Sequence, residues 1–185
     1  MKKLYIAILV LVLAITIILP AGAVQSGSLP GSPPGPPWIV VSGELKMEWN
    51  GYFELYNKIG ERGIMFCSMG FTDTYTGKLA GTANETSWGS INDTNYGTFT
   101  GMYFSMGTVE FEGSLKGKTG TFTAEFWRMG KGGTYGTDGY ARGEQTIISG
   151  TGALEKLRGT ITYTVYPQED GSYKGKYSGK LYFVK

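Results

Sequence analysis

Residues 160–183 read TITYTVYPQEDGSYKGKYSGKLYF, and this stretch decides the fold. In its first half, Ile161, Tyr163 and Val165 alternate with threonines. In its second half, aromatic residues, glycines and a leucine alternate with lysines and a serine. Such a period of two is typical of a strand with one buried and one solvated face. Between the halves, the Asp-Gly pair of residues 168–172 favours a tight reversal. The stretch therefore predicts a β-hairpin.

The same alternation continues upstream of this hairpin. It runs through residues 108–115 and 121–127, on either side of a turn predicted at residues 116–119. No amphipathic helix pattern appears after residue 38. Further strands are expected near residues 38–49, 51–59, 64–74, 78–87, 97–106 and 140–149. Eight to ten short strands at this spacing predict an all-β antiparallel domain over residues 38–185.

The N-terminus has the organisation of an export signal. Lys2 and Lys3 precede an apolar run over residues 4–19, and Pro20 and Ala21-Gly-Ala23 follow. This order predicts a signal peptide over residues 1–23, so that the protein is secreted or extracytoplasmic. The alternative is an uncleaved anchor that holds the protein to a membrane through residues 4–24. Residues 24–37 are rich in proline, glycine and serine and are expected to form a linker.

The composition excludes several functional classes. The chain has 17 basic and 15 acidic residues, so without Lys2 and Lys3 it is formally neutral, unlike most nucleic-acid-binding domains. It contains no histidine, which excludes Ser-His-Asp and Cys-His catalysis and every histidine-containing metal site. The one cysteine, Cys67, lies in an apolar run and is expected to be a small buried residue. No cofactor or metal is expected.

The segment Ser149-Gly-Thr-Gly-Ala-Leu-Glu-Lys-Leu-Arg-Gly159 is the most distinctive motif. With the glycine-rich patterns at residues 113–122 and 77–81, it resembles a microbial family of unknown function in the allene oxide cyclase-like barrel group. The resemblance spans about residues 45–185, and Glu155-Lys156 departs from it because a small residue is usual there. It implies an eight-stranded antiparallel barrel with a central cavity for an apolar molecule, and association into homo-oligomers. It assigns no functional residue.

Glutamates and aromatic residues are the candidates for a site. Glu110, Glu112 and Glu125 lie on the polar faces of neighbouring predicted strands, where one desolvated carboxyl group is able to act as an acid or a base. Solvated charges on the outer face are the alternative. The sequons at Asn84 and Asn92 predict glycosylated surface loops if the protein is exported. Seven aromatic residues are candidates to line a cavity or to stack on carbohydrate: Trp88, Tyr96, Phe99, Tyr103, Trp127, Tyr135 and Tyr140.

Three hypotheses for function follow. The first is an exported barrel that binds a small apolar molecule without turnover. The second is an isomerase or cyclase in which the cavity holds a reactive substrate and one buried glutamate assists. The third is a cell-surface structural or adhesive module, which predicts a filled barrel and an exposed patch of aromatic residues.

Overall fold

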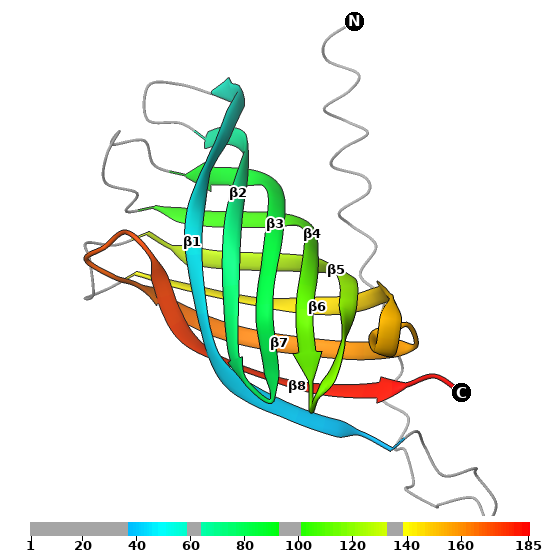
Figure 1. Ribbon diagram of the computed structural model, residues 1–185. Helices are drawn as coiled ribbons and strands as arrows, with labels where there is room; N and C mark the ends of the chain where they lie inside the picture. Colours follow the sequence, from blue (N-terminus) through cyan, green and yellow to red (C-terminus); the bar gives the residue numbers. More distant parts are fainter. Residues whose placement is uncertain (1–36, 59–63, 93–100, 133–138) are drawn as a thin grey trace, which may run out of the picture. The chain divides into compact units, whose positions relative to one another are not determined.

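The protein folds as a closed barrel of eight antiparallel strands, in which each strand pairs with its neighbours in the sequence and β8 pairs with β1 (Figure 1). The computed structural model describes residues 37–58, 64–92, 101–132 and 139–185. Within these ranges the elements are β1 (Ile39–Lys58), β2 (Ile64–Gly77), β3 (Leu79–Asn92), β4 (Met102–Leu115), β5 (Lys118–Lys131), β6 (Tyr140–Gly150), the 3₁₀ helix η1 (Gly152–Leu154), β7 (Leu157–Pro167) and β8 (Tyr173–Phe183).

The antiparallel barrel confirms the predicted fold class, but two predicted strand breaks are wrong. The described parts of the strands predicted at 38–49 and 51–59 belong to one strand, β1 (Ile39–Lys58), which passes through a register shift between Trp49 and Phe53. Gly51 has φ +90° there, so the glycine accommodates an irregularity within the strand and does not end it. The described part of the strand predicted near 97–106 and the strand predicted at 108–115 likewise form one strand, β4 (Met102–Leu115). Continuous pairing across these positions reduces the upper count of ten strands to eight.

One end of the barrel is sealed, and we call it the sealed end. Strands β4 and β5 are joined there by a two-residue turn, in which Lys116 has φ 50° and Gly117 φ 80°, as a type I′ turn requires. The motif of residues 149–159 forms the end of β6, then η1, then the start of β7. Its Leu154 is fully buried in the core, and a Cβ atom on Gly120 would stand only 3.2 Å from the Leu154 Cγ atom. The missing side chain at Gly120 thus lets η1 close over the barrel.

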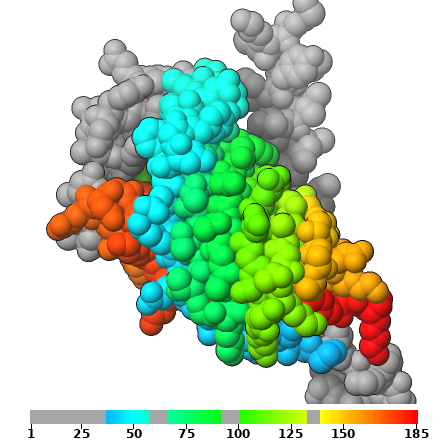
Figure 2. Space-filling model, in the orientation of Figure 1, coloured from blue at the N-terminus to red at the C-terminus, as the bar shows by residue number. Residues whose placement is uncertain are grey.

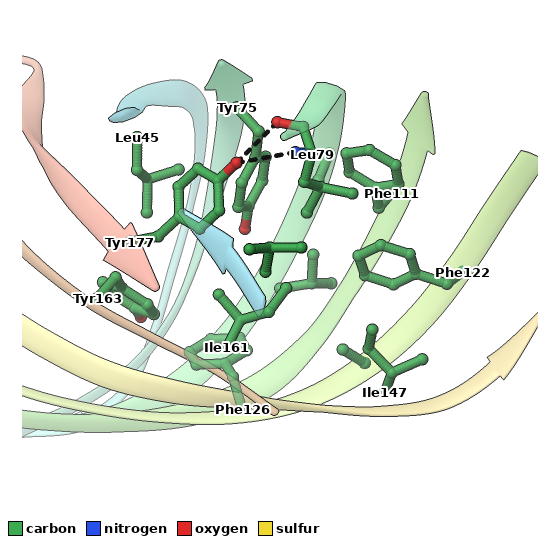
Figure 3. Packing of buried hydrophobic residues seen from close by; sticks show 14 of the residues in the cluster. Leu45, Tyr75, Leu79, Phe111, Phe122, Phe126, Ile147, Ile161, Tyr163 and Tyr177 are labelled. Atoms are coloured by element: carbon green, nitrogen blue, oxygen red, sulfur yellow. Dashed lines mark hydrogen bonds between the residues drawn. The ribbon is translucent and has the colours of Figure 1, made fainter. Parts of the chain in front are cut away.

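The core fills the sealed half of the barrel. The rings of Phe111 and Phe122 stack with their centroids 4.5 Å apart, and Tyr75 meets Phe111 edge to face (Figure 3). The hydroxyl group of Tyr177 accepts a hydrogen bond from the Leu79 N–H group at 3.1 Å and donates to the Leu79 carbonyl oxygen at 2.8 Å (Figure 3). This side chain of β8 therefore ties the β2–β3 connection to the core. The predicted C-terminal hairpin is also present, as β7 and β8.

Several predictions lie outside the described residues. These are the signal peptide (1–23), almost all of the linker (24–37), the aromatic residues Tyr96, Phe99 and Tyr135, and the Asp93 and Thr94 positions of the second sequon. Within the described ranges, no helix is long and apolar enough to span a membrane. Asn84 is exposed but lies inside β3, so its sequon is not on the loop that the sequence predicted.

Candidate functional site

The three glutamates predicted as candidate catalytic residues do not lie inside the barrel. Glu110 and Glu112 of β4 and Glu125 of β5 are all exposed on its outer face. Glu112 contributes to a shallow outer hollow of about 530 Å³ over β3, β4 and β5, whose lining also includes Thr119 and Thr121. Each of them lies next to buried residues along its strand, and because successive side chains point to opposite faces, these carboxyl groups point into solvent. The buried acidic residues of the described chain are instead Asp73 and Glu85.

Arg128 and Glu85 form an ion pair inside the barrel. The Arg128 Nη2 atom lies 2.9 Å from Glu85 Oε1, and Nη1 donates a hydrogen bond to Oε2 at 3.2 Å. The two side chains are 3% and 0% exposed. They come from β5 and β3, which are separated by β4, so the guanidinium group extends over the inner face of β4 to reach Glu85. It also lies 4.9 Å from the ring centroid of Phe71, as a cation–π contact.

Asp73 lies beside this ion pair on β2 and is fully buried. The Tyr75 hydroxyl group lies 3.5 Å from Asp73 Oδ2, at the limit of a hydrogen bond, and 2.8 Å from Gln145 Nε2, which donates to it. Tyr75 thus connects Asp73 to Gln145 of β6. The interior also contains the buried hydroxyl groups of Ser105 and Tyr163.

Five buried polar atoms of the described residues have no hydrogen-bond partner. They are Asp73 Oδ1, Glu85 Oε1, Ser105 Oγ, Arg128 Nε and Tyr163 OH, although Glu85 Oε1 makes the 2.9 Å ion contact given above. We call these five residues the interior polar cluster. A buried polar group without a partner costs roughly 1–3 kcal/mol, so native proteins contain few of them. Asp73, Glu85, Arg128 and Tyr163 interact electrostatically with one another, and Ser105 stands opposite Arg128, so the cluster marks one region of the interior as a candidate site.

The charges within the interior polar cluster follow from burial. Burial raises the pKa of Asp73 well above its usual range, and the charge of Glu85 adds to this effect. Burial also raises the pKa of Glu85, against the opposing effect of the Arg128 guanidinium group. For Arg128, burial opposes the charged form, but the Glu85 carboxylate outweighs it and the pKa rises. The 2.9 Å contact makes Arg128 and Glu85 an ion pair, and burial favours the neutral form of the Asp73 carboxyl group beside it.

The end opposite the sealed end carries apolar side chains on its inner face. The pairing of β1 with β8 ends at Met47 and Tyr173, while β1 continues along β2 and stands beyond the barrel wall (Figure 2). On the inner side of this extension, Trp49, Phe53 and Leu55 are 60%, 41% and 41% exposed. We call the end that they border the mouth. Its inner surface consists of Trp49, Phe53, Leu55, Met69, Phe71, Ile91 and Tyr103.

The predicted aromatic residues divide between the two faces of the barrel. Tyr103 points inward and packs with Ile91 at the mouth, and Tyr140 is partly buried. Trp88 and Trp127 lie exposed on the outer face, where both oppose Met106 in the strand pairing and thus form one row across β3, β4 and β5. Phe66 and Phe104 are exposed in the next row towards the mouth. The outer face therefore carries an aromatic patch of its own.

The phase of each strand is the signal that locates the buried charges in the sequence. Arg128 continues the buried series of Phe122, Ala124 and Phe126, and Asp73 stands between inward-facing Phe71 and Tyr75. The prediction from sequence considered the glutamates on the polar faces of the strands, with solvated outer-face charges as the alternative, and did not consider the acidic residues on the inward phase, Asp73 and Glu85. Within the described residues, no group of three or more acidic or cysteine side chains is arranged to hold a metal ion. Cys67 is buried, as expected, and burial raises its pKa.

Comparison with known proteins places the chain in a family. A solved structure of a DUF3224-family protein of unknown function from Shewanella oneidensis MR-1 superimposes on it with a TM-score of 0.50. The two chains share 20% sequence identity, and the alignment covers 80% of this chain and 100% of the other, which supports the fold alone. No curated protein matches the chain. The resemblance to the allene oxide cyclase-like group stays a prediction. The sequence model of the DUF3224 proteins of unknown function matches residues 54–177, more than half of the chain, and the chain therefore belongs to the DUF3224 family.

Proposed function

We propose that the protein binds a small, largely apolar molecule at the mouth of its barrel, without turnover. One observation carries this proposal: Trp49, Phe53 and Leu55 are exposed on the inner side of the mouth, above inward-facing Met69 and an otherwise buried interior. Exposed apolar side chains on a concave surface gain free energy when a ligand covers them. We further infer that this binding takes place outside the cytoplasm, because residues 1–23 have the order of an export signal.

The position of the proposed site differs from the central cavity that the family resemblance implied. Large side chains occupy the sealed half, and Tyr75, Phe111 and Phe122 there are each at most 2% exposed. A ligand therefore covers the mouth and reaches inward no farther than the interior polar cluster. Burying a chain of about eight methylene groups contributes ~6 kcal/mol before the cost of association, which predicts weak to micromolar binding.

Calorimetric titration of the full chain with 2-undecanone tests the proposal. We expect saturable binding to the unaltered protein, and Leu55→Ser weakens it about tenfold because part of the apolar contact is lost. Ile148→Ser is the matched control, since Ile148 is 43% exposed on the outer face, close to the 41% of Leu55. No heat of binding with the unaltered protein, or equal losses in the two variants, contradicts a site at the mouth.

A second candidate function is recognition of a surface by the outer aromatic patch. The row of Trp88, Met106 and Trp127 and the filled core meet the two conditions of the adhesive-module hypothesis. Planar exposed aromatic side chains on a sheet suit stacking against flat, weakly polar partners. Trp88→Ala with Trp127→Ala is expected to abolish retention on insoluble polysaccharide while leaving 2-undecanone binding intact. The opposite pattern favours the mouth.

The isomerase or cyclase hypothesis requires different acid–base residues from the three glutamates. Glu110, Glu112 and Glu125 are exposed, so an acid–base role inside the barrel falls to Asp73, whose neutral form burial favours, or to Glu85, which is paired with Arg128. Two carboxyl groups in different protonation states are the arrangement that acid–base catalysis uses. If the protein isomerises a bound ketone, exchange of its α-hydrogens with deuterated water is accelerated, and Asp73→Asn removes the acceleration.

A further inference from the structure

We propose that the interior polar cluster binds the carbonyl oxygen of the ligand, so that the ligand is an uncharged apolar molecule ending in a ketone, aldehyde or ester group. The inference rests on the proposed function and specifies its ligand. It starts from the unpartnered atoms of Ser105, Arg128 and Tyr163, all of which carry hydrogens that are free to be donated.

These three donors share one transverse row of the barrel. Ser105 of β4 stands directly opposite Arg128 of β5, Arg128 opposite Gly143 of β6, and Gly143 opposite Tyr163 of β7. The Tyr163 ring leans over Gly143, because its hydroxyl oxygen lies 2.7 Å from where a Cβ atom on that glycine would stand. The absence of a side chain at Gly143 thus brings the Tyr163 hydroxyl group towards Arg128. Three donors in one row converge on the same part of the interior.

The charges of the cluster select an uncharged acceptor. The Arg128 guanidinium group is already neutralised by Glu85, with a closest contact of 2.9 Å, and its Nε–H group is the donor that remains. A carboxylate ligand would bring a second negative charge next to Glu85, and burial would penalise it further. An ammonium group carries only hydrogen-bond donors, so it is not able to accept a hydrogen bond from any of the three donors. A carbonyl oxygen accepts two hydrogen bonds and carries no net charge.

Two side chains of the mouth cover this row of donors. Phe71 lies over the Arg128 guanidinium group, and Tyr103 lies over Gly130, the inward position that follows Arg128 along β5. Both are only partly buried, unlike the donors beneath them. A carbonyl group that enters from the mouth therefore reaches the donors after these two rings turn aside. The apolar remainder of the ligand then lies along Met69, Phe53 and the other residues of the mouth.

The test compares three ligands of equal chain length on the full chain: 2-undecanone labelled with ¹³C at its carbonyl carbon, undecane and undecanoate. We expect the ketone to bind about tenfold or more tightly than either of the others, as two hydrogen bonds permit. The carbonyl ¹³C resonance of the bound ketone is expected to stay far downfield of its position in liquid alkane, because the oxygen accepts hydrogen bonds in the site as it does in water. Tyr163→Phe reduces both effects, whereas Tyr166→Phe on the exposed face of β7 leaves them unchanged.

The outcomes separate the two proposals. If undecane binds as tightly as the ketone and the carbonyl resonance of the bound ketone lies at its position in liquid alkane, the carbonyl site is refuted and binding at the mouth stands. If undecanoate binds tightest, the charge argument is refuted. If none of the three ligands binds, the proposed function itself is refuted, and this inference with it. The resonance shift is measured on the unaltered protein, so the test does not depend on the folding of a variant.

Discussion

Replacing Arg128 with methionine removes the positive partner of a carboxylate that has no access to water. Methionine keeps much of the length and apolar stem of arginine, so the substitution mainly removes charge and hydrogen bonds. Glu85, which is 0% exposed and meets the guanidinium group at 2.9 Å and 3.2 Å, then has to stay charged without its partner or take up a proton. Breaking a buried pair on one side typically costs about 3–5 kcal/mol.

Protonation of Glu85 sets the size of this loss. A glutamate with an unperturbed pKa of about 4.3 costs ~3.7 kcal/mol to protonate at pH 7, but only ~1 kcal/mol at pH 5. In the Arg128→Met variant the pKa of Glu85 in the folded state lies above its unfolded value. The folded state then binds more protons, so stability falls as the pH rises through this window. We expect a loss of about 4 kcal/mol at pH 7 and about 1–2 kcal/mol at pH 5.

Urea unfolding followed by circular dichroism at both pH values measures the effect. The double variant Glu85→Leu with Arg128→Met removes both charges and is expected to recover most of the stability. Lys46→Met is the control, because Lys46 and Glu48 form an exposed pair 2.6 Å apart that solvent screens. A loss below about 1 kcal/mol at pH 7, or a loss of equal size at pH 5, would refute the account of Glu85 as a desolvated charge.

Three further predictions concern single positions. The raised pKa of Asp73 makes the unfolding free energy of the unaltered protein fall as the pH rises above about 4, by up to ~1.4 kcal/mol per pH unit, and Asp73→Asn removes this slope in urea titrations across pH. Gly143→Ala places a Cβ atom 2.5 Å from the Trp127 carbonyl oxygen and 2.7 Å from the Tyr163 hydroxyl group, so thermal unfolding should show a loss of about 1–3 kcal/mol. Leu154→Ala should cost about 2–5 kcal/mol by urea unfolding, because it opens a cavity in the seal, and a loss no larger than that of exposed Ile148→Ala contradicts the sealing role.

Much of the fold was predictable because period-two alternation is a local signal. The hairpin of residues 160–183 and the turn at Lys116-Gly117 each depend on a few neighbouring residues. The strand count was less predictable, because a glycine that ends a strand and a glycine that bends one look alike in sequence. Gly51 with φ +90° lies inside β1, whereas Gly117 with φ 80° makes a turn. Only the pairing partner distinguishes them.

The candidate site was less predictable than the fold. The inward position of Arg128 follows from its phase with Phe126, which the sequence contains. Its pairing with Glu85 does not, since the two residues are 43 positions apart and on strands that are not neighbours. They meet because the barrel wall curves, so that inward-facing side chains two strands apart converge over the inner face of β4. The exposed mouth also depends on how far β1 extends beyond β8, which no local pattern records.

Leu154 and η1 close the barrel at the end where β6 leads into β7. A ligand bound on the other side of the core then enters and leaves without passing this closed end, and a polymer is not able to thread through the barrel. In the proposed complex the carbonyl end of the ligand lies at the interior polar cluster, and the other end lies beside Trp49, which is 60% exposed. In such a complex the protein selects ligands by the chemistry of the carbonyl end, and it tolerates apolar chains of different length.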